Sequence, residues 1–233
     1  MIAAGACLIG RGRAAALVPA FLLQAAYLAQ HGMILGRLPL LGPHDTLILF
    51  AASISLMTLC TGMAPSLKAA SGIRSAAGMM SGIVTLAALL FPPLNIPLPQ
   101  ILDTLWFELH VVMAFMAYGL FVVCGLTGVA RLAGSGRDLH DILYVTALSG
   151  WVFFSVSMIT GGIWGYYAWG TYWLWTPKEL WTSVLWLYYA LLLHLRLKGG
   201  YDRLVSLLAA FGIPVMLFTY LGVSMLMKSS HSF

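Results

Sequence analysis

The stretch LWFELHVVMAFMAYGLFVVCGLTGVARL, residues 105–132, decides the fold class. No Asp, Glu, Lys or Arg stands between Glu108 and Arg131 within it. A helix needs about 20 mostly apolar residues to cross the hydrocarbon core of a bilayer, and this stretch is longer than that. The sequence therefore predicts a transmembrane helix here.

The composition of the whole chain agrees with a membrane protein. Of 233 residues, 61% are hydrophobic and 8% are charged, whereas a soluble domain usually carries about 25% charged residues. So few charges could not keep a surface soluble, which excludes an ordinary cytosolic enzyme, a disordered chain and a nucleic-acid binder. The net charge of +5 comes from single Lys and Arg residues between apolar runs, which indicates topology markers. The three cysteines stand far apart without a CxxC pair, so neither a disulfide scaffold nor a zinc site is indicated.

Seven stretches of the chain are long and apolar enough to span a bilayer. They predict an all-α fold, a polytopic membrane helical bundle of about seven transmembrane helices that forms a single domain over residues 1–233. The first stretch is too long for the apolar part of a cleavable signal peptide, so we expect a retained helix. The predicted spans are 14–35, 45–63, 74–92, 105–132, 139–161, 178–198 and 203–226.

Lys and Arg in the short loops predict how the helices are oriented. Nine of the 12 Lys and Arg residues fall at one set of helix ends, and Arg37, Lys178 and Lys228 fall at the other. Cytoplasmic loops carry the excess of positive charge, so we expect the amino terminus inside and the carboxyl terminus outside. In a bacterium this predicts a multi-pass protein of the inner (cytoplasmic) membrane, active at the periplasmic face. The outer loops are predicted at 36–44, 93–104, 162–177 and 227–233.

Tryptophan is concentrated in one segment, GGIWGYYAWGTYWLWTPKELW, residues 161–181. An interfacial aromatic belt is one interpretation, but a belt is spread over many helix ends, whereas this segment is predicted to be one outer loop and the helix turn after it. The density favours a flat aromatic platform for a large apolar ligand. The tryptophans of the segment are Trp164, Trp169, Trp173, Trp175 and Trp181.

The end of this segment predicts a helix start. Thr176 can cap the helix, Pro177 suits the first helical position, and Glu179 stands three residues after the cap. The pair would satisfy free backbone N–H groups reciprocally and hold the loop in place. A direct role of Glu179 in ligand binding is a second possibility that the sequence leaves open.

Two histidines are predicted at the same face as the Trp-rich segment. His110 opens one span after an outer loop, and His231 lies in the outer tail. Neutral imidazole binds haem iron, and the planar macrocycle stacks on aromatic rings. The combination favours axial ligation of a haem by His110 and His231.

The other four histidines have different settings. His194 is predicted near the inner end of its span and His31 near the outer end of the first span. An ionisable residue inside a span is costly and is taken as functional by default. His44 and His140 are expected to be hydrogen-bonded residues at helix ends.

The segment WGTYWLWTPKELWTSVLWLYYALLLHLR, residues 169–196, resembles the tryptophan-rich "WWD" haem-handling motif of the cytochrome c assembly protein family. In this resemblance His194 corresponds to the family's transmembrane histidine, and the tail with His231 is similar to the family's ending after the last span. Residues 106–125, with His110, resemble the span that carries the first outer histidine, and residues 30–52 are a weaker match. The chain looks closest to the CcsA (ResC-like) branch, because the CcmC branch predicts the His194 and His231 placements less well.

The resemblance implies a function in the biogenesis of c-type cytochromes. A b-type haem would be bound transiently, moved across the membrane and presented outside, where its vinyl groups join the thiols of a CxxCH apocytochrome c. The outer histidines would be the external haem ligands, and the transmembrane histidine would hold haem on its way. A ResB/CcsB-like membrane protein is the implied partner, and the pair would act as a cytochrome c haem lyase or synthase. One departure stands out, because Thr176 occupies the place of the motif's usual Asp and removes a negative charge beside the haem.

Two other functions are weighed against this one. A b-type electron-transfer subunit would prefer paired histidines at matching depth, whereas His31 and His194 are predicted near opposite faces. A permease or structural subunit without haem would leave the Trp-rich segment and the outer histidines unexplained. A visible spectrum of the purified protein separates the three classes.

Overall fold

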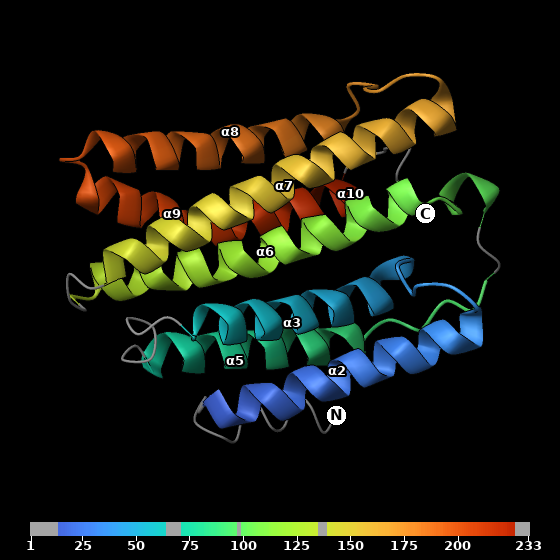
Figure 1. Cartoon of the computed structure of the whole chain (residues 1–233), viewed down its shortest axis with the longest axis horizontal. Helices are drawn as coiled ribbons and strands as arrows, with labels where there is room; N and C mark the ends of the chain where they lie inside the picture. Colours follow the sequence, from blue (N-terminus) through green and yellow to red (C-terminus); the bar gives the residue numbers. More distant parts are fainter. Residues whose placement is uncertain (1–13, 64–70, 97–98, 135–138, 227–233) are drawn as a thin grey trace.

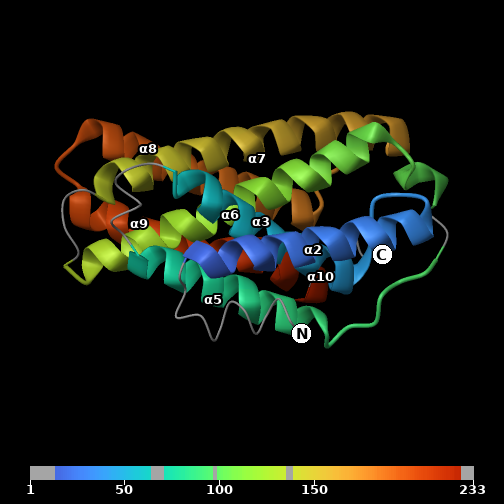
Figure 2. The same ribbon diagram turned by 60° about the horizontal axis from the view of Figure 1, so that its bottom comes forward.

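The computed structural model describes residues 14–63, 71–96, 99–134 and 139–226, and within these ranges the chain is helical with no strand. Seven long helices within these ranges run lengthwise beside one another (Figure 1 and Figure 2). The prediction of an all-α polytopic bundle is confirmed. The long helices are α2 (Ala14–Leu35), α3 (Gly42–Thr61), α5 (Ser71–Ala88), α6 (Leu105–Leu132), α7 (His140–Trp169), α8 (Pro177–Lys198) and α9 (Asp202–Leu217), with short elements η1 (Gln100–Leu102), η3 (Phe218–Gly222) and α10 (Val223–Leu226).

Among the described residues, six of these helices are long and apolar enough to cross a membrane. In this count α9 and η3 form one span. The seventh helix, α5, has 18 residues and falls short of that standard. Successive helices alternate in direction, so the turns gather at two ends of the bundle (Figure 1). The end that holds the α7–α8 turn and the start of α6 is called the cleft end below.

Helix α6 is the centre of the bundle and contacts α3, α5, α7 and α9. In Figure 1, α2, α3 and α5 lie on one side of it and α7, α8 and α9 on the other. Two of its glycines allow this, because a Cβ at Gly119 would lie 2.6 Å from the Ser53 carbonyl oxygen and one at Gly128 2.6 Å from that of Ser206. Small residues let helix backbones approach closely inside a membrane.

Helix α7 is longer than predicted, since it continues from His140 through Trp169 before Gly170 ends it with a φ of 74°. The predicted outer loop 162–177 is therefore wrong in its first half, and the connection comprises residues 170–176. The glycines at 161 and 162 lie inside this helix, and Gly161 makes room for a neighbouring group, as a Cβ at Gly161 would lie 2.6 Å from Nδ1 of His110.

The last predicted span, 203–226, is interrupted by a turn of π-helix. Pro214 lies inside α9, and the π-helical turn η3 begins at Phe218. A π-helical turn widens the backbone and redirects its carbonyl groups, and such turns are frequent at functional sites. One of these carbonyls, that of Tyr220, accepts a hydrogen bond from another helix.

Candidate functional site: an aromatic cleft with one histidine

A cleft opens at the cleft end of the bundle between α6, α7 and the first turns of α8. Its open space, counted to the mouth and including solvent, is about 650 Å³. Aromatic and small side chains predominate in the lining, with a few polar groups. The lining residues are His110, Ala114, Tyr118, Phe154, Ser157, Met158, Gly161, Gly162, Trp164, Trp169, Tyr172, Trp173, Lys178, Glu179 and Thr182.

His110 is fixed in the wall of this cleft by hydrogen bonds to α7. Its Nδ1 lies 2.8 Å from the carbonyl oxygen of Ser157, and the Ser157 hydroxyl donates in return to the His110 carbonyl at 2.8 Å. A carbonyl can only accept, so Nδ1 carries the proton and Nε2 of the neutral ring keeps its lone pair. Nε2 has no hydrogen-bond partner among the described residues, which leaves it available to a metal, as in many metal-binding histidines.

Trp164 forms the aromatic wall beside His110. The two rings are nearly parallel, at 15° with centroids 6.5 Å apart, and Trp169 meets Trp164 edge-on at 4.9 Å. The Trp164 indole N–H donates to the Ile101 carbonyl at 2.7 Å, and its side chain is 2% exposed. The wall is therefore rigid, which suits it to hold a flat apolar ligand.

The start of α8 bears the predicted capping box. The Glu179 carboxylate accepts the backbone N–H groups of Thr176 and Leu174, each at 2.9 Å, and the Thr176 hydroxyl accepts that of Glu179 at 3.4 Å. The prediction of a reciprocal cap is confirmed. The cap holds the short connection that carries Trp173 into the cleft lining.

The structure brings together five of the predicted site residues and separates the rest. His110, Trp164, Trp169, Trp173 and Glu179 all line the cleft.

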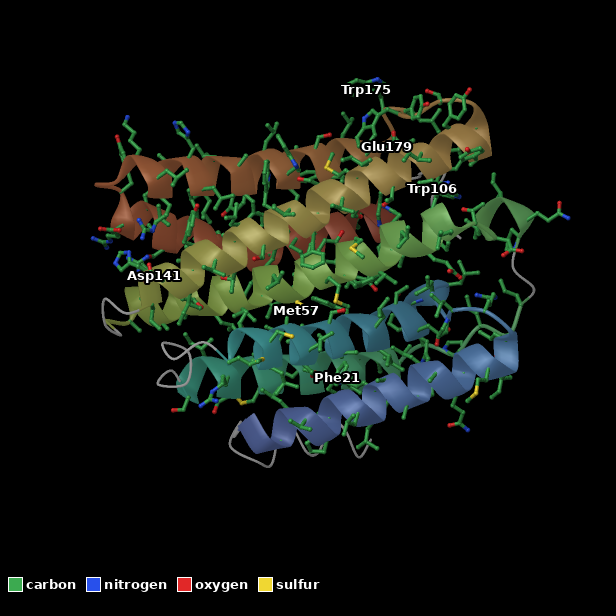
Figure 3. All side chains as sticks on the ribbon, viewed as in Figure 1. Phe21, Met57, Trp106, Asp141, Trp175 and Glu179 are labelled. Carbon is green, nitrogen blue, oxygen red and sulfur yellow. The ribbon has the colours of Figure 1, made fainter. Side chains whose placement is uncertain are left out.

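The remaining predicted site residues lie elsewhere. Trp175 is 69% exposed with a φ of 57°, and it stands at the outer edge of the bundle beyond Glu179 (Figure 3). Trp181 packs edge-on against Phe218 at 4.6 Å. His194 is exposed on α8, towards the opposite end of the helix from the cleft. His231 lies outside the described residues.

Several lining residues were not singled out as site residues by sequence, among them Ser157, Tyr118 and Lys178. Ser157 orients His110, Tyr118 comes from the middle of α6, and Lys178 contributes a cation. Helical periodicity offered a signal for Ser157, because residues 157, 161 and 164 fall on one face of a helix. No local pattern pointed to Tyr118 or to the inward course of the Lys178 side chain.

The remaining histidines form hydrogen bonds within the protein. His31 places Nδ1 3.0 Å from Asp45 Oδ1 and Nε2 3.1 Å from Asn95 Oδ1. His44 bonds the Tyr27 hydroxyl with one ring nitrogen and, with the other, the carbonyls of Ala88 and Phe91 at and just after the end of α5. His140 bonds Arg131 at 2.7 Å, so the prediction of hydrogen-bonded helix-end residues is confirmed for His44 and His140.

The fold and the cleft together define a polytopic helical membrane protein with a histidine-bearing aromatic site. Among the described residues, no group of three or more His, Cys, Asp and Glu could hold a bare metal ion. The sequence matches the family described as "Cytochrome C assembly protein" over residues 21–231. The chain belongs to this family.

Similar proteins include several with curated names. The chain is 34% identical to "Protein NrfI" of Wolinella succinogenes over 176 residues, which is 68% of this chain and 20% of NrfI. It is 42% identical to "Cytochrome c biogenesis protein CcsA" of Prochlorococcus marinus subsp. pastoris over 98 residues, 42% of this chain and 31% of CcsA. The CcsA of Chlamydomonas reinhardtii is 30% identical over 151 residues, 59% of this chain and 43% of that protein. The matched region thus spans between a fifth and just under half the length of these relatives.

A solved structure shares the fold. The protein named "Cytochrome c Heme Lyase CcmF" superimposes with a TM-score of 0.72 over 98% of this chain and 46% of its own, at 18% sequence identity. At that identity the likeness concerns the arrangement of helices.

Proposed function

We propose that this protein handles haem in the biogenesis of c-type cytochromes. It binds a b-type haem transiently in the aromatic cleft and presents it to a CxxCH apocytochrome c. The single observation that carries this proposal is His110, whose Nδ1 is engaged by Ser157 while Nε2 is left for iron. Membership of the cytochrome c assembly family supports it.

The donor set of the cleft fits haem as cargo. Bound haem brings an iron that takes an imidazole on each face and vinyl groups that react with thiols. Trp164 and Trp169 offer ring surfaces for the macrocycle, and His110 offers one axial nitrogen. We propose His231, in the tail that follows α10, as the second axial ligand. Trp173 and Glu179 complete the wall on the α8 side, with Glu179 acting through the backbone it holds.

Trp175 and Trp181 have separate parts in this proposal. Trp175 projects from the outer edge of the bundle beside the cleft (Figure 3), which places a large exposed aromatic ring where an apocytochrome would approach. Trp181 holds the start of α8 against η3 through Phe218. Both residues thus assist haem handling without lining the cleft.

The cleft end is proposed to face the periplasm of a bacterium, with the chain in the inner membrane. The excess of Lys and Arg at the opposite helix ends supports this orientation. It puts the haem on the side where c-type cytochromes with CxxCH sites would receive it.

His194 is proposed to hold haem at an earlier stage, together with a ResB/CcsB-like membrane partner. It is exposed on α8 and near the end of the bundle away from His110, so the two cannot bind one haem. An exposed histidine on a membrane helix can meet a histidine supplied by a neighbouring protein. The isolated chain is therefore expected to form the external site alone, and a second bis-histidine site should appear when the partner is bound. Two tight bis-histidine haems on the isolated chain, the second lost in His194→Ala, would contradict this.

Co-expression with a CxxCH reporter tests the whole function. The host should lack its own maturation system, and the chain should be expressed with and without a ResB-like partner. Covalent haem on the reporter that depends on His110 is the expected result. A stable, stoichiometric, redox-cycling haem that never leaves the chain would instead favour an electron-transfer subunit, and a chain without any Soret band would favour a permease or structural subunit.

A further inference from the structure

Tyr118 forms the part of the cleft that lies deepest in the bundle. The lining residues on α6 are His110, Ala114 and Tyr118, whose spacing of four places them on one face of the helix. Tyr118 follows His110 by eight residues, about 12 Å along the axis at a rise of 1.5 Å per residue. Its ring packs at 5.9 Å against that of Phe154, which is the lining residue of α7 farthest from the cleft end. These two rings therefore form the floor of the cleft.

The hydroxyl group of Tyr118 differs from those of other tyrosines inside the bundle. The Tyr188 hydroxyl donates to a backbone carbonyl of α9 at 2.5 Å, and the Tyr220 hydroxyl donates to that of Thr46 at 2.7 Å. Tyr118 is 7% exposed, and its hydroxyl forms no hydrogen bond with any described residue. Burial of a hydroxyl without a partner is unfavourable, and a buried tyrosine usually finds one. The floor of the cleft thus presents a donor that the protein itself does not use.

Aromatic neighbours hold the ring that carries this hydroxyl. Phe50, Phe115 and Phe154 have ring centroids 6.3, 5.6 and 5.9 Å from that of Tyr118. These contacts restrict the ring, so little entropy is lost when its hydroxyl binds a ligand. A phenol is protonated at neutral pH and can donate. The chain therefore supplies one positioned donor in an otherwise aromatic floor.

The distance between Tyr118 and His110 indicates which part of a haem this donor would meet. Both residues lie on one face of α6 and about 12 Å apart along it, so the phenol cannot take the iron position opposite His110. It stands instead where the edge of a macrocycle centred at His110 would lie. The hydrogen-bond acceptors at the edge of haem are its two propionate carboxylates. A hydrogen bond from a hydroxyl to a carboxylate is shorter and stronger than one to a neutral acceptor.

We propose that the Tyr118 hydroxyl donates a hydrogen bond to a propionate of the haem in the cleft and so fixes which edge of the macrocycle points inward. The assignment rests on the haem-handling function proposed above and narrows the ligand to a planar macrocycle with a carboxylate at its inner edge. The vinyl groups stand on the opposite half of the haem. With a propionate at the floor they face the mouth of the cleft, where the thiols of an apocytochrome would arrive.

Two iron porphyrins separate this contact from a role in shaping the cleft. Ferric haem carries propionates, whereas ferric etioporphyrin carries methyl and ethyl groups alone around the same iron and ring. Both are titrated into the purified protein in detergent, and dissociation constants are taken from the Soret band. Tyr118→Phe removes one oxygen and keeps the ring. It should weaken haem about tenfold, the order of effect of a hydrogen bond to a charged group, and leave etioporphyrin unchanged.

Two further variants are controls. Tyr189 has a buried hydroxyl that also lacks a hydrogen-bond partner among the described residues, but it does not line the cleft. Tyr189→Phe is therefore the matched control and should change neither dissociation constant. His110→Gly should weaken both porphyrins by the same factor, because both offer the same iron. Thermal unfolding of ligand-free Tyr118→Phe should occur at or above the wild-type temperature, since the hydroxyl has no protein partner to lose.

The outcomes are distinct from one another. Unchanged haem binding in Tyr118→Phe, or an equal loss for both porphyrins, overturns the propionate contact. A lower unfolding temperature of ligand-free Tyr118→Phe also overturns it, because the hydroxyl would then serve a group of the protein. If the contact fails while the wild type still binds haem through His110, the haem-handling function stands. A wild type that binds neither porphyrin removes both proposals.

Discussion

Histidines of the cleft and of the α2–α3–α5 side lie at the same end of the bundle, yet their ring nitrogens are bonded differently. His31 and His44 engage both ring nitrogens with groups of the protein. His110 engages Nδ1 alone. A histidine that bonds protein groups with both ring nitrogens links parts of the protein to one another. A histidine that bonds the protein through one nitrogen can bind a ligand with the other.

The two regions also differ in how their polar groups are satisfied. On the α2 side, Gln24 bonds Ser81 and Thr85 at 3.0 and 2.9 Å, and Ser55 bonds Ser81 at 2.8 Å. This network is closed within the protein, as stable buried polar networks are. The cleft instead contains His110, whose Nε2 has no hydrogen-bond partner among the described residues. The comparison teaches that polar groups on the α2–α3–α5 side connect helices to one another, whereas the α6–α7–α8 side contains the cleft that we propose as the haem site.

The largest effect is expected when the imidazole of His110 is removed. His110→Gly should weaken haem retention on the order of 100-fold, since removing even a partner that orients a ligand costs 10–100-fold. Added imidazole should restore part of the haem, because it can enter the space left by the side chain. Haem content and the Soret spectrum of the purified protein measure both effects. His194→Ala is the control and should leave the isolated chain unchanged.

The contrast also predicts what loss of Asp45 does on the α2 side. The Asp45 carboxylate is buried and bonds Nδ1 of His31 at 3.0 Å, so Asp45→Ala leaves that ring nitrogen of a buried imidazole without its partner. We expect a loss of about 2 kcal/mol in the free energy of unfolding with normal haem occupancy per folded molecule. Thermal unfolding in detergent, read beside the Soret absorbance, checks this. A selective loss of haem without loss of stability would assign this side a direct role in binding.

A finer test moves His110 without removing it. A Cβ at residue 161 would lie 2.6 Å from Nδ1 of His110, whereas one at residue 162 would meet nothing closer than the Tyr172 carbonyl oxygen at 3.4 Å. Gly161→Ala should displace the imidazole and weaken haem binding about tenfold, in line with the cost of overpacking. Gly162→Ala should have little effect and is the matched control. Equal effects of the two changes would show that ring position does not govern haem binding.

The smallest effect concerns the cap at Thr176. Thr176→Ala should cost about 1 kcal/mol of stability, and Thr176→Asp should be neutral because Asp caps as well as Thr. Thermal unfolding of the two variants provides the measurement. Increased reporter maturation in Thr176→Asp at unchanged stability would show a chemical role for the carboxylate that the family motif usually has. Loss of folding in Thr176→Asp would contradict the capping role.

Local sequence determined the features that depend on near neighbours. The apolar run of residues 105–132 predicted α6 with the bounds that the structure has. The cap at Thr176 was equally predictable, because its bonds join groups within five residues of one another. Hydrophobic length and capping chemistry act within a few turns of helix, and so they can be recognised in a single stretch of sequence.

Tertiary structure decided which residues face the cleft. The predicted span ended at residue 161, whereas α7 continues as a helix through Trp169, so that Gly161 lies against His110 and Trp164 lines the cleft. His110 depends on a carbonyl 47 positions away, and Lys178 on one 42 positions away. Such contacts follow from how whole helices cross, which no local pattern specifies. The sequence by itself therefore determined a membrane bundle with histidine and tryptophan at one end, while the packing of α6, α7 and α8 decided which of those side chains form a site.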